Sequence, residues 1–276
     1  MRSDLAALAA VILWGSLAAL GASLTHIPPF LLTGIGLLVG SLVALPVSRF
    51  DVRKLKATPK ALGVGVFGLF GYHAALFAGL QNAPSVQANL VNYLWPLLIV
   101  ILAPLFLPGT PLTLRHILAA IGGFIGAGIA ILSGAELVAG FAIGYVYAFA
   151  AAVIWASYSL LTKRVGFNTS AVGLFAAISG LLSLAIHFWF EPAAAIAGGD
   201  WLLLILLGLG PMGASFFLWD YALKHGNPQQ VGLIAFLTPL ISTTLLLLMT
   251  GTELSPLLLL ATALILGSAF IGSRSG

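Results

Sequence analysis

The chain alternates between long apolar runs and short polar interruptions along its whole length. A membrane-spanning helix requires roughly 20 mostly apolar residues, and about ten runs of this length can be marked. They lie near residues 4–24, 30–48, 59–80, 85–106, 114–132, 140–162, 170–190, 201–223, 228–249 and 255–273, with ends placed to about 3 residues. The pattern predicts an all-α membrane protein with ten transmembrane helices in a single membrane domain over residues 1–276.

Composition supports this reading of the pattern. Hydrophobic residues make up 61% of the 276 residues and charged residues 7%, with a mean hydropathy of +1.13, whereas soluble domains carry about a quarter charged residues. No stretch is left for a soluble catalytic domain, so we expect no enzyme. The first segment, with Arg2 ahead of an apolar run, also has the form of a signal peptide, but a matching segment recurs later and favours a retained helix. The chain has no cysteine, which excludes disulfides and thiol catalysis.

All 11 Lys and Arg residues lie at the chain ends or in alternate loops of the predicted topology. The opposite loops hold Glu136, Glu191, Asp200 and Glu253. The positive-inside bias therefore predicts that both termini are cytoplasmic. Because the basic residues sit at helix ends and form no soluble basic face, we expect a lipid bilayer around the chain and no nucleic-acid partner. The basic residues are Arg2, Arg49, Arg53, Lys54, Lys56, Lys60, Arg115, Lys163, Arg164, Lys224 and Arg274.

Two parts of the sequence recur at nearly the same offset. AVILWGSLAAL around Trp14 matches AAVIWASYSLL around Trp155, an offset of 141 (155 minus 14). AGLQNAPSVQANLVNYLWPLL matches DYALKHGNPQQVGLIAFLTPLI and pairs Pro96 with Pro239 at an offset of 143 (239 minus 96). We interpret these as internal repeats over 1–134 and 135–276, helices one to five and six to ten. Since five is odd, the second repeat enters the membrane from the opposite side. The alternative is chance similarity between apolar helices.

Pro96 and Pro239 fall inside predicted helices four and nine. Proline removes one backbone hydrogen bond and frees a carbonyl, which must find another partner in the membrane. Matched helix breaks in two repeats predict hinges beside a central binding site. A harmless kink at each proline is the alternative.

A polar stripe runs along helix four. Its spacing places the side chains on one helix face, and a polar face inside a membrane has to meet protein or water. It predicts either the lining of a cavity or a hydrogen-bonding seam between helices. The stripe consists of Ser85, Asn89, Asn92, Tyr93 and Pro96.

Aromatic residues accompany the stripe. Trp14 and Trp155 lie at equivalent mid-helix positions, where an indole offers an apolar wall and one N–H donor to a solute, or simply packs. Tyr72, Trp95 and Tyr158 are further candidates for cavity walls. Tryptophans near helix ends are typical of the membrane interface, and these are Trp189, Trp201 and Trp219. Trp219 is also one of the aromatic residues that accompany the stripe.

Two titratable groups lie inside the predicted helices. His73 is deep in helix three, where an imidazole can donate and accept hydrogen bonds. We predict that it contacts the substrate or carries a proton, and the alternative is a purely structural hydrogen bond. Asp220 is followed four residues later by Lys224, so we predict an ion pair at that helix end, with proton coupling as the alternative. The His residues form no cluster with the spacing of metal ligands, and we expect no metal.

Of the glycine motifs in this chain, only the GxxxG pairs support a structural prediction. Gly63 to Gly68 formally matches GxGxxG, but no strand precedes it and we assign it no function. The GxxxG pairs Gly36–Gly40 and Gly122–Gly126 predict helices that approach closely.

These features resemble the EamA branch of the drug/metabolite transporter superfamily over the whole chain. The resemblance rests on the AVILWGSLAAL opening and on YALKHGNPQQVGLIAFLTPLISTTLLLLMTGTELS, where Gly251-Thr252-Glu253 precedes the last helix. The first half departs from the family pattern, with Leu107-Pro108-Gly109-Thr110 where an acid is frequent. Gly71-Tyr72-His73-Ala74 and Asn92-Tyr93-Leu94-Trp95-Pro96 are similar to the YddG-type group of aromatic amino acid exporters in this family.

The resemblance implies a bacterial inner-membrane protein that exports amino acids, aromatic ones included, by alternating access through a cavity between the repeats. It implies no cofactor, and we expect a monomer. No acid lies at the centre of helix one, which favours a facilitator over obligatory proton antiport. The resemblance assigns the cavity lining to Trp14, Tyr72, His73, Tyr93, Trp95, Trp155 and Ser242, beside the candidates Asn89, Asn92 and Tyr158 from the residue patterns.

Other functions remain open at this point. The runner-up is a multidrug or other small-metabolite exporter of the same superfamily, with proton coupling. Phosphorylated cargo is disfavoured because the helices hold no internal Arg or Lys to bind phosphate. A membrane enzyme acting on lipid-linked substrates would need clustered acids or a metal site, and a structural or sensory protein would leave the paired helix breaks unexplained.

Overall fold

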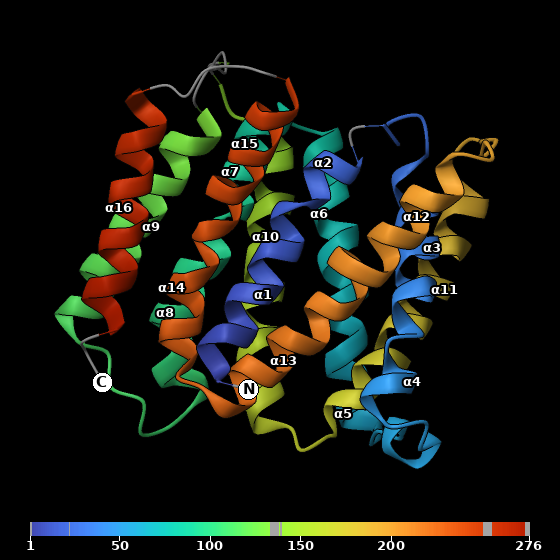
Figure 1. Ribbon diagram of the computed structural model, residues 1–276, viewed down its shortest axis with the longest axis horizontal. Helices are drawn as coiled ribbons and strands as arrows, with labels where there is room; N and C mark the ends of the chain where they lie inside the picture. The colour runs from blue at the N-terminus through green and yellow to red at the C-terminus, as the bar shows by residue number, and fades with distance from the viewer. Residues whose placement is uncertain (1, 22, 133–137, 139, 251–255, 274–276) are drawn as a thin grey trace.

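The computed structural model describes residues 2–21, 23–132, 138, 140–250 and 256–273, and every regular element within them is helical (Figure 1). Four features considered above lie outside the described residues: Glu136, the motif Gly251-Thr252-Glu253, Arg274 and the boundary between residues 134 and 135.

The chain up to residue 132 folds into nine α-helices and two irregular turns among the described residues. The 3₁₀ turn η1 spans Val52–Leu55 and the π turn η2 spans Phe67–Gly71. The helices are α1 (Ser3–Gly15), α2 (Leu17–Gly21), α3 (Pro29–Ser41), α4 (Ala44–Val47), α5 (Pro59–Val66), α6 (Tyr72–Gln81), α7 (Ser85–Asn92), α8 (Leu94–Phe106) and α9 (Leu114–Leu132).

From residue 143 onward the described chain continues with seven further α-helices and two turns. The 3₁₀ turn η3 spans Thr169–Ala171 and the π turn η4 spans Gly210–Ala214. The helices are α10 (Ile143–Arg164), α11 (Val172–Phe190), α12 (Asp200–Leu209), α13 (Ser215–His225), α14 (Pro228–Ala235), α15 (Leu237–Thr250) and α16 (Pro256–Ser273).

Eight helical segments of the described chain are long and apolar enough to cross a membrane. Their ends agree with the predicted ranges to about 3 residues, and the remaining predicted ranges, 228–249 and 255–273, contain α14, α15 and α16. The eight segments are Ser3–Gly21, Pro29–Val47, Pro59–Gln81, Ser85–Phe106, Leu114–Leu132, Ile143–Arg164, Thr169–Phe190 and Asp200–His225.

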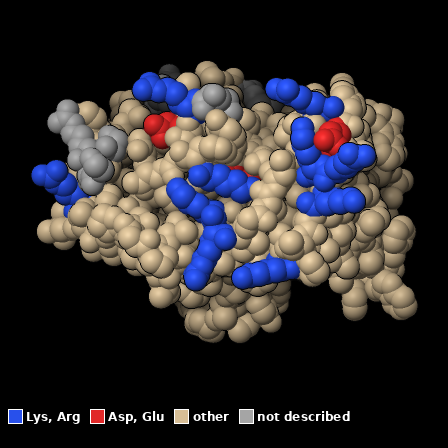
Figure 2. Space-filling model, turned by 90° about the horizontal axis from the view of Figure 1, so that it is seen from below, with Lys and Arg blue, Asp and Glu red and all other residues tan. Residues whose placement is uncertain are grey.

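The helices stand side by side and run between two faces of the molecule (Figure 1). α9 packs against α16 at one end of the row, α3 packs against α11 and α12 at the other, and α1 and α10 lie between them. α1 and α10 run in opposite directions in this view. Seen from below, the face where α1 begins carries many Lys and Arg side chains (Figure 2).

Several predicted spans are broken where the sequence interferes with the hydrogen-bond ladder. α7 ends at Asn92 and α8 begins at Leu94, and α14 and α15 are separated by Phe236 in the same way. In both places a proline lies three residues after the break, because proline has no N–H for the carbonyl four residues earlier and clashes with it. The predicted breaks at Pro96 and Pro239 are therefore present as interruptions at residues 93 and 236.

Two π turns recur at the same offset as the prolines, since η2 begins at Phe67 and η4 at Gly210 (210 minus 67 is 143). In η4, Pro211 cannot donate to the carbonyl four residues earlier, which explains the widened turn there. In η2 the turn contains Gly68, against which the Tyr158 ring lies so closely that a Cβ at Gly68 would overlap it. Single π turns are frequent at functional sites.

The close approach predicted from the glycine pairs is confirmed. A Cβ on Gly40 would overlap the carbonyl oxygen of Met212 and come within 2.8 Å of that of Gly208. A Cβ on Gly126 would lie 3.1 Å from the carbonyl oxygen of Ala261. α3 thus packs tightly on α12 and η4, and α9 packs tightly on α16. Gly63 to Gly68 lies in α5 and η2, so that GxGxxG match is not a nucleotide-binding turn.

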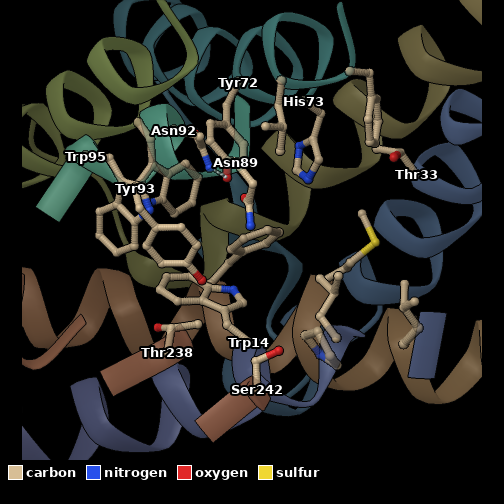
Figure 3. Close-up of a pocket in the computed structure, with 18 of the residues that line it drawn as sticks. Trp14, Thr33, Tyr72, His73, Asn89, Asn92, Tyr93, Trp95, Thr238 and Ser242 are labelled. Atoms are coloured by element: carbon tan, nitrogen blue, oxygen red, sulfur yellow. Dashed lines mark hydrogen bonds between the residues drawn. The ribbon is translucent and has the colours of Figure 1, made fainter. Parts of the chain in front are cut away.

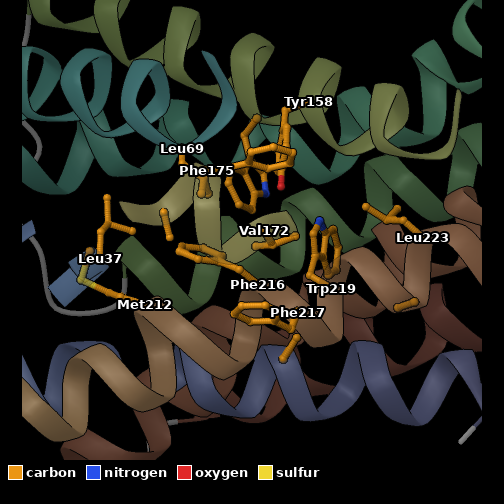
Figure 4. Close-up of a cluster of buried hydrophobic side chains, with 14 of the residues drawn as sticks. Leu37, Leu69, Tyr158, Val172, Phe175, Met212, Phe216, Phe217, Trp219 and Leu223 are labelled. Carbon is orange, nitrogen blue, oxygen red and sulfur yellow. The ribbon is translucent and has the colours of Figure 1, made fainter. Parts of the chain in front are cut away.

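Large buried side chains of α10, α11 and α13 pack together in a hydrophobic core (Figure 4). Phe175, Phe217 and Trp219 are at most 4% exposed. This core includes cavity-lining residues such as Trp155 and Phe216 and so supports one side of the cavity.

Candidate functional site

A cavity of about 300 Å³ lies at the centre of the molecule (Figure 3). Side chains of α6 and α7 line one side of it, and Thr238 and Ser242 of α15 lie on the opposite side. Its volume is at the lower end of the range of roughly 300–1,000 Å³ for small-molecule sites. None of its lining residues in the described chain is Lys, Arg, Asp or Glu.

The structure brings nearly all of the predicted site residues to this cavity. They are far apart in the chain and are brought together because α7 packs against α10 and α15 packs against α1. The predicted residues that line the cavity are Trp14, Tyr72, His73, Asn89, Asn92, Tyr93, Trp95, Trp155 and Ser242.

Tyr158 is the exception among the predicted lining residues. Its ring is 2% exposed and packs beneath Trp155, with ring centroids 5.3 Å apart. One turn of α10 places it below the cavity, where it supports the indole and does not face the cavity. The assignment of Tyr158 to the lining was therefore wrong.

Several other residues line the cavity without having been predicted from the sequence, including Thr33, Phe77, Met212, Phe216 and Thr238. Two of them could have been found from the repeat offset of 143, because it pairs His73 with Phe216 (216 minus 73) and Trp95 with Thr238 (238 minus 95). Thr33 gave only a weak signal, as a single hydroxyl in an apolar helix.

Aromatic rings form the floor of the cavity around Trp14. Its ring centroid lies 5.7 Å from that of Trp155, 6.0 Å from that of Trp95 and 5.1 Å from that of Trp219. The first two pairs meet edge to face, the arrangement that the ring quadrupole favours. These contacts tie α1 to α8, α10 and α13.

Trp219 packs against the rings of Trp14 and Trp95 without lining the cavity itself, and it does not lie at the membrane interface. It is 1% exposed, and its Nε1 donates a hydrogen bond of 3.0 Å to Oγ of Ser159. The interfacial interpretation of Trp219 was wrong because α13 continues past it to His225 and buries it. Trp189 and Trp201 are 82% and 47% exposed, as expected for residues at helix ends.

His73 is buried in the wall of the cavity, with 8% of its surface exposed. Its Nδ1 donates to the carbonyl oxygen of Leu69 at 2.6 Å. In a neutral imidazole this leaves Nε2 as a hydrogen-bond acceptor, and Nε2 has no partner among the described residues. The structural hydrogen bond and a role in substrate contact are therefore compatible, because they use different nitrogens.

Asp220 lies outside the cavity lining, and its predicted ion pair is confirmed. Lys224 Nζ lies 2.7 Å from Asp220 Oδ2, and the hydroxyl of Thr169 donates to the same oxygen at 2.6 Å. Lys224 also donates to the carbonyl oxygen of Phe167 at 3.0 Å. The pair thus fastens α13 to the segment between α10 and α11.

A family model, several named exporters and a solved structure are similar to this chain. The EamA-like transporter family matches the chain twice, over residues 1–132 and 142–274. The aromatic amino acid exporter YddG of Ancylobacter novellus is 37% identical and aligns over 96% of this chain and 94% of its own. The YddG of Salmonella typhimurium is 25% identical, over 92% of this chain and 90% of its own.

Two further relatives extend this picture. A probable terminal-alkyne amino-acid exporter of Streptantibioticus cattleyicolor is 26% identical over 84% of this chain and 80% of its own. A solved crystal structure at 35% identity covers 99% of this chain and 97% of its own chain, with a TM-score of 0.90. Together with the apolar helices, the family match makes this a multi-pass membrane protein and a transporter. The chain therefore belongs to the EamA-like transporter family, as its resemblance to the YddG exporters indicated.

Proposed function

We propose that this protein exports amino acids, aromatic ones included, through the central cavity. The observation that carries the proposal is the cavity itself, because its uncharged polar wall and aromatic floor match a small solute with an apolar ring and a polar end. Relatives that align over most of the chain are named aromatic amino acid exporters, and a more distant one is named an amino-acid exporter.

We further propose that ten transmembrane helices form two inverted repeats, over 1–134 and 135–276, which work by alternating access. Three observations support this: the double family match, the helix breaks and π turns that recur at one offset (236 minus 93 and 210 minus 67, both 143), and the opposite directions of α1 and α10 in Figure 1. Pro96 and Pro239 would act as hinges, since the helix pieces beside them lack one backbone hydrogen bond.

Transport by this protein is proposed to be facilitated diffusion of the amino acid down its gradient. In the described chain no Asp or Glu lines the cavity, and the acid of α1 is Asp4 in its first turn. The buried carboxylate of Asp220 is engaged by Lys224 and Thr169. An acid that binds and releases a proton with each cycle would instead be expected in contact with the substrate.

We propose that the protein is a monomer in the bacterial inner membrane with both termini in the cytoplasm. The basic face in Figure 2 supports this orientation, because Lys and Arg in short loops favour the cytoplasmic side. Cysteine labelling of single-cysteine variants at Ser3 and Ser23 with a membrane-impermeant reagent on intact cells tests it. The expected result is labelling at position 23 only. Labelling at position 3 would show that the protein has the opposite orientation in the membrane.

The transport proposal is tested with purified protein in liposomes. Labelled phenylalanine, leucine and lysine are supplied with and without an imposed pH gradient, and flux is compared with protein-free liposomes. Phenylalanine flux in the absence of the pH gradient is the expected result. Absence of flux for every amino acid would contradict amino acid export and favour another small-metabolite cargo. Strict dependence on the pH gradient would contradict the facilitator and favour proton coupling.

A further inference from the structure

Asn92 has one side-chain atom whose hydrogen-bonding capacity is unused. The residue lines the cavity although it is only 3% exposed, and its Nδ2 donates to the hydroxyl of Tyr72 at 3.2 Å. Its Oδ1 is buried and has no hydrogen-bond partner among the described residues. A buried acceptor without a partner is unfavourable by about 1–3 kcal/mol. A donor on a bound ligand would remove this penalty.

The backbone at Asn92 favours a positively charged donor. Asn92 is the last residue of α7, and the C-terminal end of a helix carries partial negative charge. The carbonyl of Asn92 also lacks its usual partner four residues on, because residue 96 is proline. The freed carbonyl is therefore a second acceptor at this break, beside Oδ1.

The second helix break differs from the first in one informative way. The carbonyl of Ala235, which loses its partner to Pro239, accepts a hydrogen bond of 2.8 Å from the hydroxyl of Thr238. The position equivalent to Thr238 in the first break is Trp95, at the repeat offset of 143 (238 minus 95), and its side chain has no hydroxyl. Only the break at α7 thus lacks a side-chain hydroxyl for the freed carbonyl.

The lining of the cavity offers acceptors and aromatic rings to a cation. Thr33 Oγ1 lies far from Asn92 in Figure 3, but it also lines the cavity, is buried and has no partner among the described residues. His73 Nε2 is an acceptor in the same wall, since Nδ1 is used by Leu69. Rings of Tyr93 and Trp95 lie beside Asn92 in Figure 3, and aromatic faces attract ammonium groups.

We propose that Asn92 Oδ1 binds the ammonium group of the transported amino acid, and that the cavity selects ligands with a positively charged nitrogen. This inference rests on the proposed export of amino acids and assigns the end of the substrate that meets α7. The carboxylate then points away from α7, toward the side of the cavity where Ser242 presents its hydroxyl. Asn92 is accordingly a specificity-determining residue.

The experiment compares two analogues of phenylalanine that each keep one charged group. 2-Phenylethylamine keeps the ammonium and 3-phenylpropionate keeps the carboxylate. Each competes with labelled phenylalanine in counterflow by the wild-type protein in liposomes with a strongly buffered interior. We expect 2-phenylethylamine to inhibit at a concentration at least about tenfold lower than 3-phenylpropionate. Stronger inhibition by 3-phenylpropionate would overturn the proposal. It would indicate that the amide nitrogen of Asn92, and not Oδ1, faces the ligand.

Variants assign this preference to Asn92. Asn92→Leu removes the acceptor at similar size and should weaken inhibition by 2-phenylethylamine about tenfold or more. Asn92→Asp keeps an acceptor and adds a negative charge, so it should retain that inhibition and weaken inhibition by 3-phenylpropionate. The matched control is Asn82→Leu, because Asn82 is exposed and its side chain bonds only to the Ala78 carbonyl among the described residues. An amine preference that survives in Asn92→Leu would overturn the assignment.

Binding to the purified protein separates this inference from the transport proposal. Thermal stabilisation of the detergent-purified chain by 2-phenylethylamine should be present in the wild type and lost in Asn92→Leu, whether or not phenylalanine is transported. No phenylalanine flux together with this stabilisation would contradict amino acid export and leave the ammonium site standing. Phenylalanine flux together with equal stabilisation of Asn92→Leu and wild type would support amino acid export and contradict the ammonium site at Asn92.

Discussion

Trp14 and Trp155 meet edge to face at the floor of the cavity, with ring centroids 5.7 Å apart and ring planes at 76°. They are far apart in the chain and lie on α1 and α10, which run in opposite directions in Figure 1. Trp14 and Trp155, which occupy equivalent positions in the two matching sequence segments, thus meet in the structure. A movement of α1 relative to α10 would have to change this contact.

The Trp14–Trp155 contact should be measurable as a coupling energy. We expect Trp14→Leu and Trp155→Leu each to destabilise the protein, and the double variant to lose about 0.5–1.5 kcal/mol less than the sum, because the ring pair can be lost only once. The measurement is the free energy of unfolding in mixed micelles titrated with SDS. Additive effects would show that the two rings do not stabilise one another.

His73→Ala should reduce amino acid flux in liposomes while the amount of protein in the membrane stays normal. The physical reason is that Nε2 is an unused acceptor at the cavity wall, whereas Nδ1 bonds to Leu69. His73→Gln and His73→Asn separate the two nitrogens, since the longer amide reaches the position of Nε2 and the shorter one that of Nδ1. Flux should be higher in the Gln variant. Unchanged flux in His73→Ala would show that His73 has only a structural role in packing.

Lys224→Met should strongly destabilise the protein because it leaves the Asp220 carboxylate buried without its cation. Removing one partner of a buried ion pair costs about 3–5 kcal/mol, and Asp220 is 1% exposed. The double variant Lys224→Met with Asp220→Asn should recover part of the loss. Unfolding free energies measure both, with the exposed Lys60→Met as the matched control. Equal stability of the single and double variants would show that the buried charge of Asp220 is not what destabilises Lys224→Met.

Gly40→Ala should destabilise the packing of α3 on α12 and η4. The added Cβ would overlap the Met212 carbonyl oxygen, and backbone atoms cannot move aside as a side chain can. Overpacking of this kind costs about 1–3 kcal/mol. Gly63→Ala is the matched control, because nothing lies within 4 Å of a Cβ there. Thermal unfolding in detergent should show a lower midpoint for Gly40→Ala only.

The parts of the site that were predictable are those with a local signal in the chain. Asn89 and Asn92 stood out because amides are rare in apolar helices, and Pro96 and Pro239 stood out because proline disrupts any helix. Tyr158 was misplaced because its position on α10 says nothing about which neighbour covers it. Thr33 was missed because a threonine can bond within its own helix and needs no cavity.

Sequence alone predicted the eight membrane-spanning segments found in the described chain, their approximate ends and the two helix breaks before Pro96 and Pro239, since apolar length and proline geometry are properties of single segments. It also indicated the family, through motifs spread along the chain. Only the tertiary structure decided that Trp219 packs against Trp14, that Asp220 is paired outside the cavity and that Asn92 keeps an unpartnered oxygen among the described residues. The physical reason is that hydrogen-bond partners and ring contacts depend on which helices become neighbours, and residues far apart in the chain supply them.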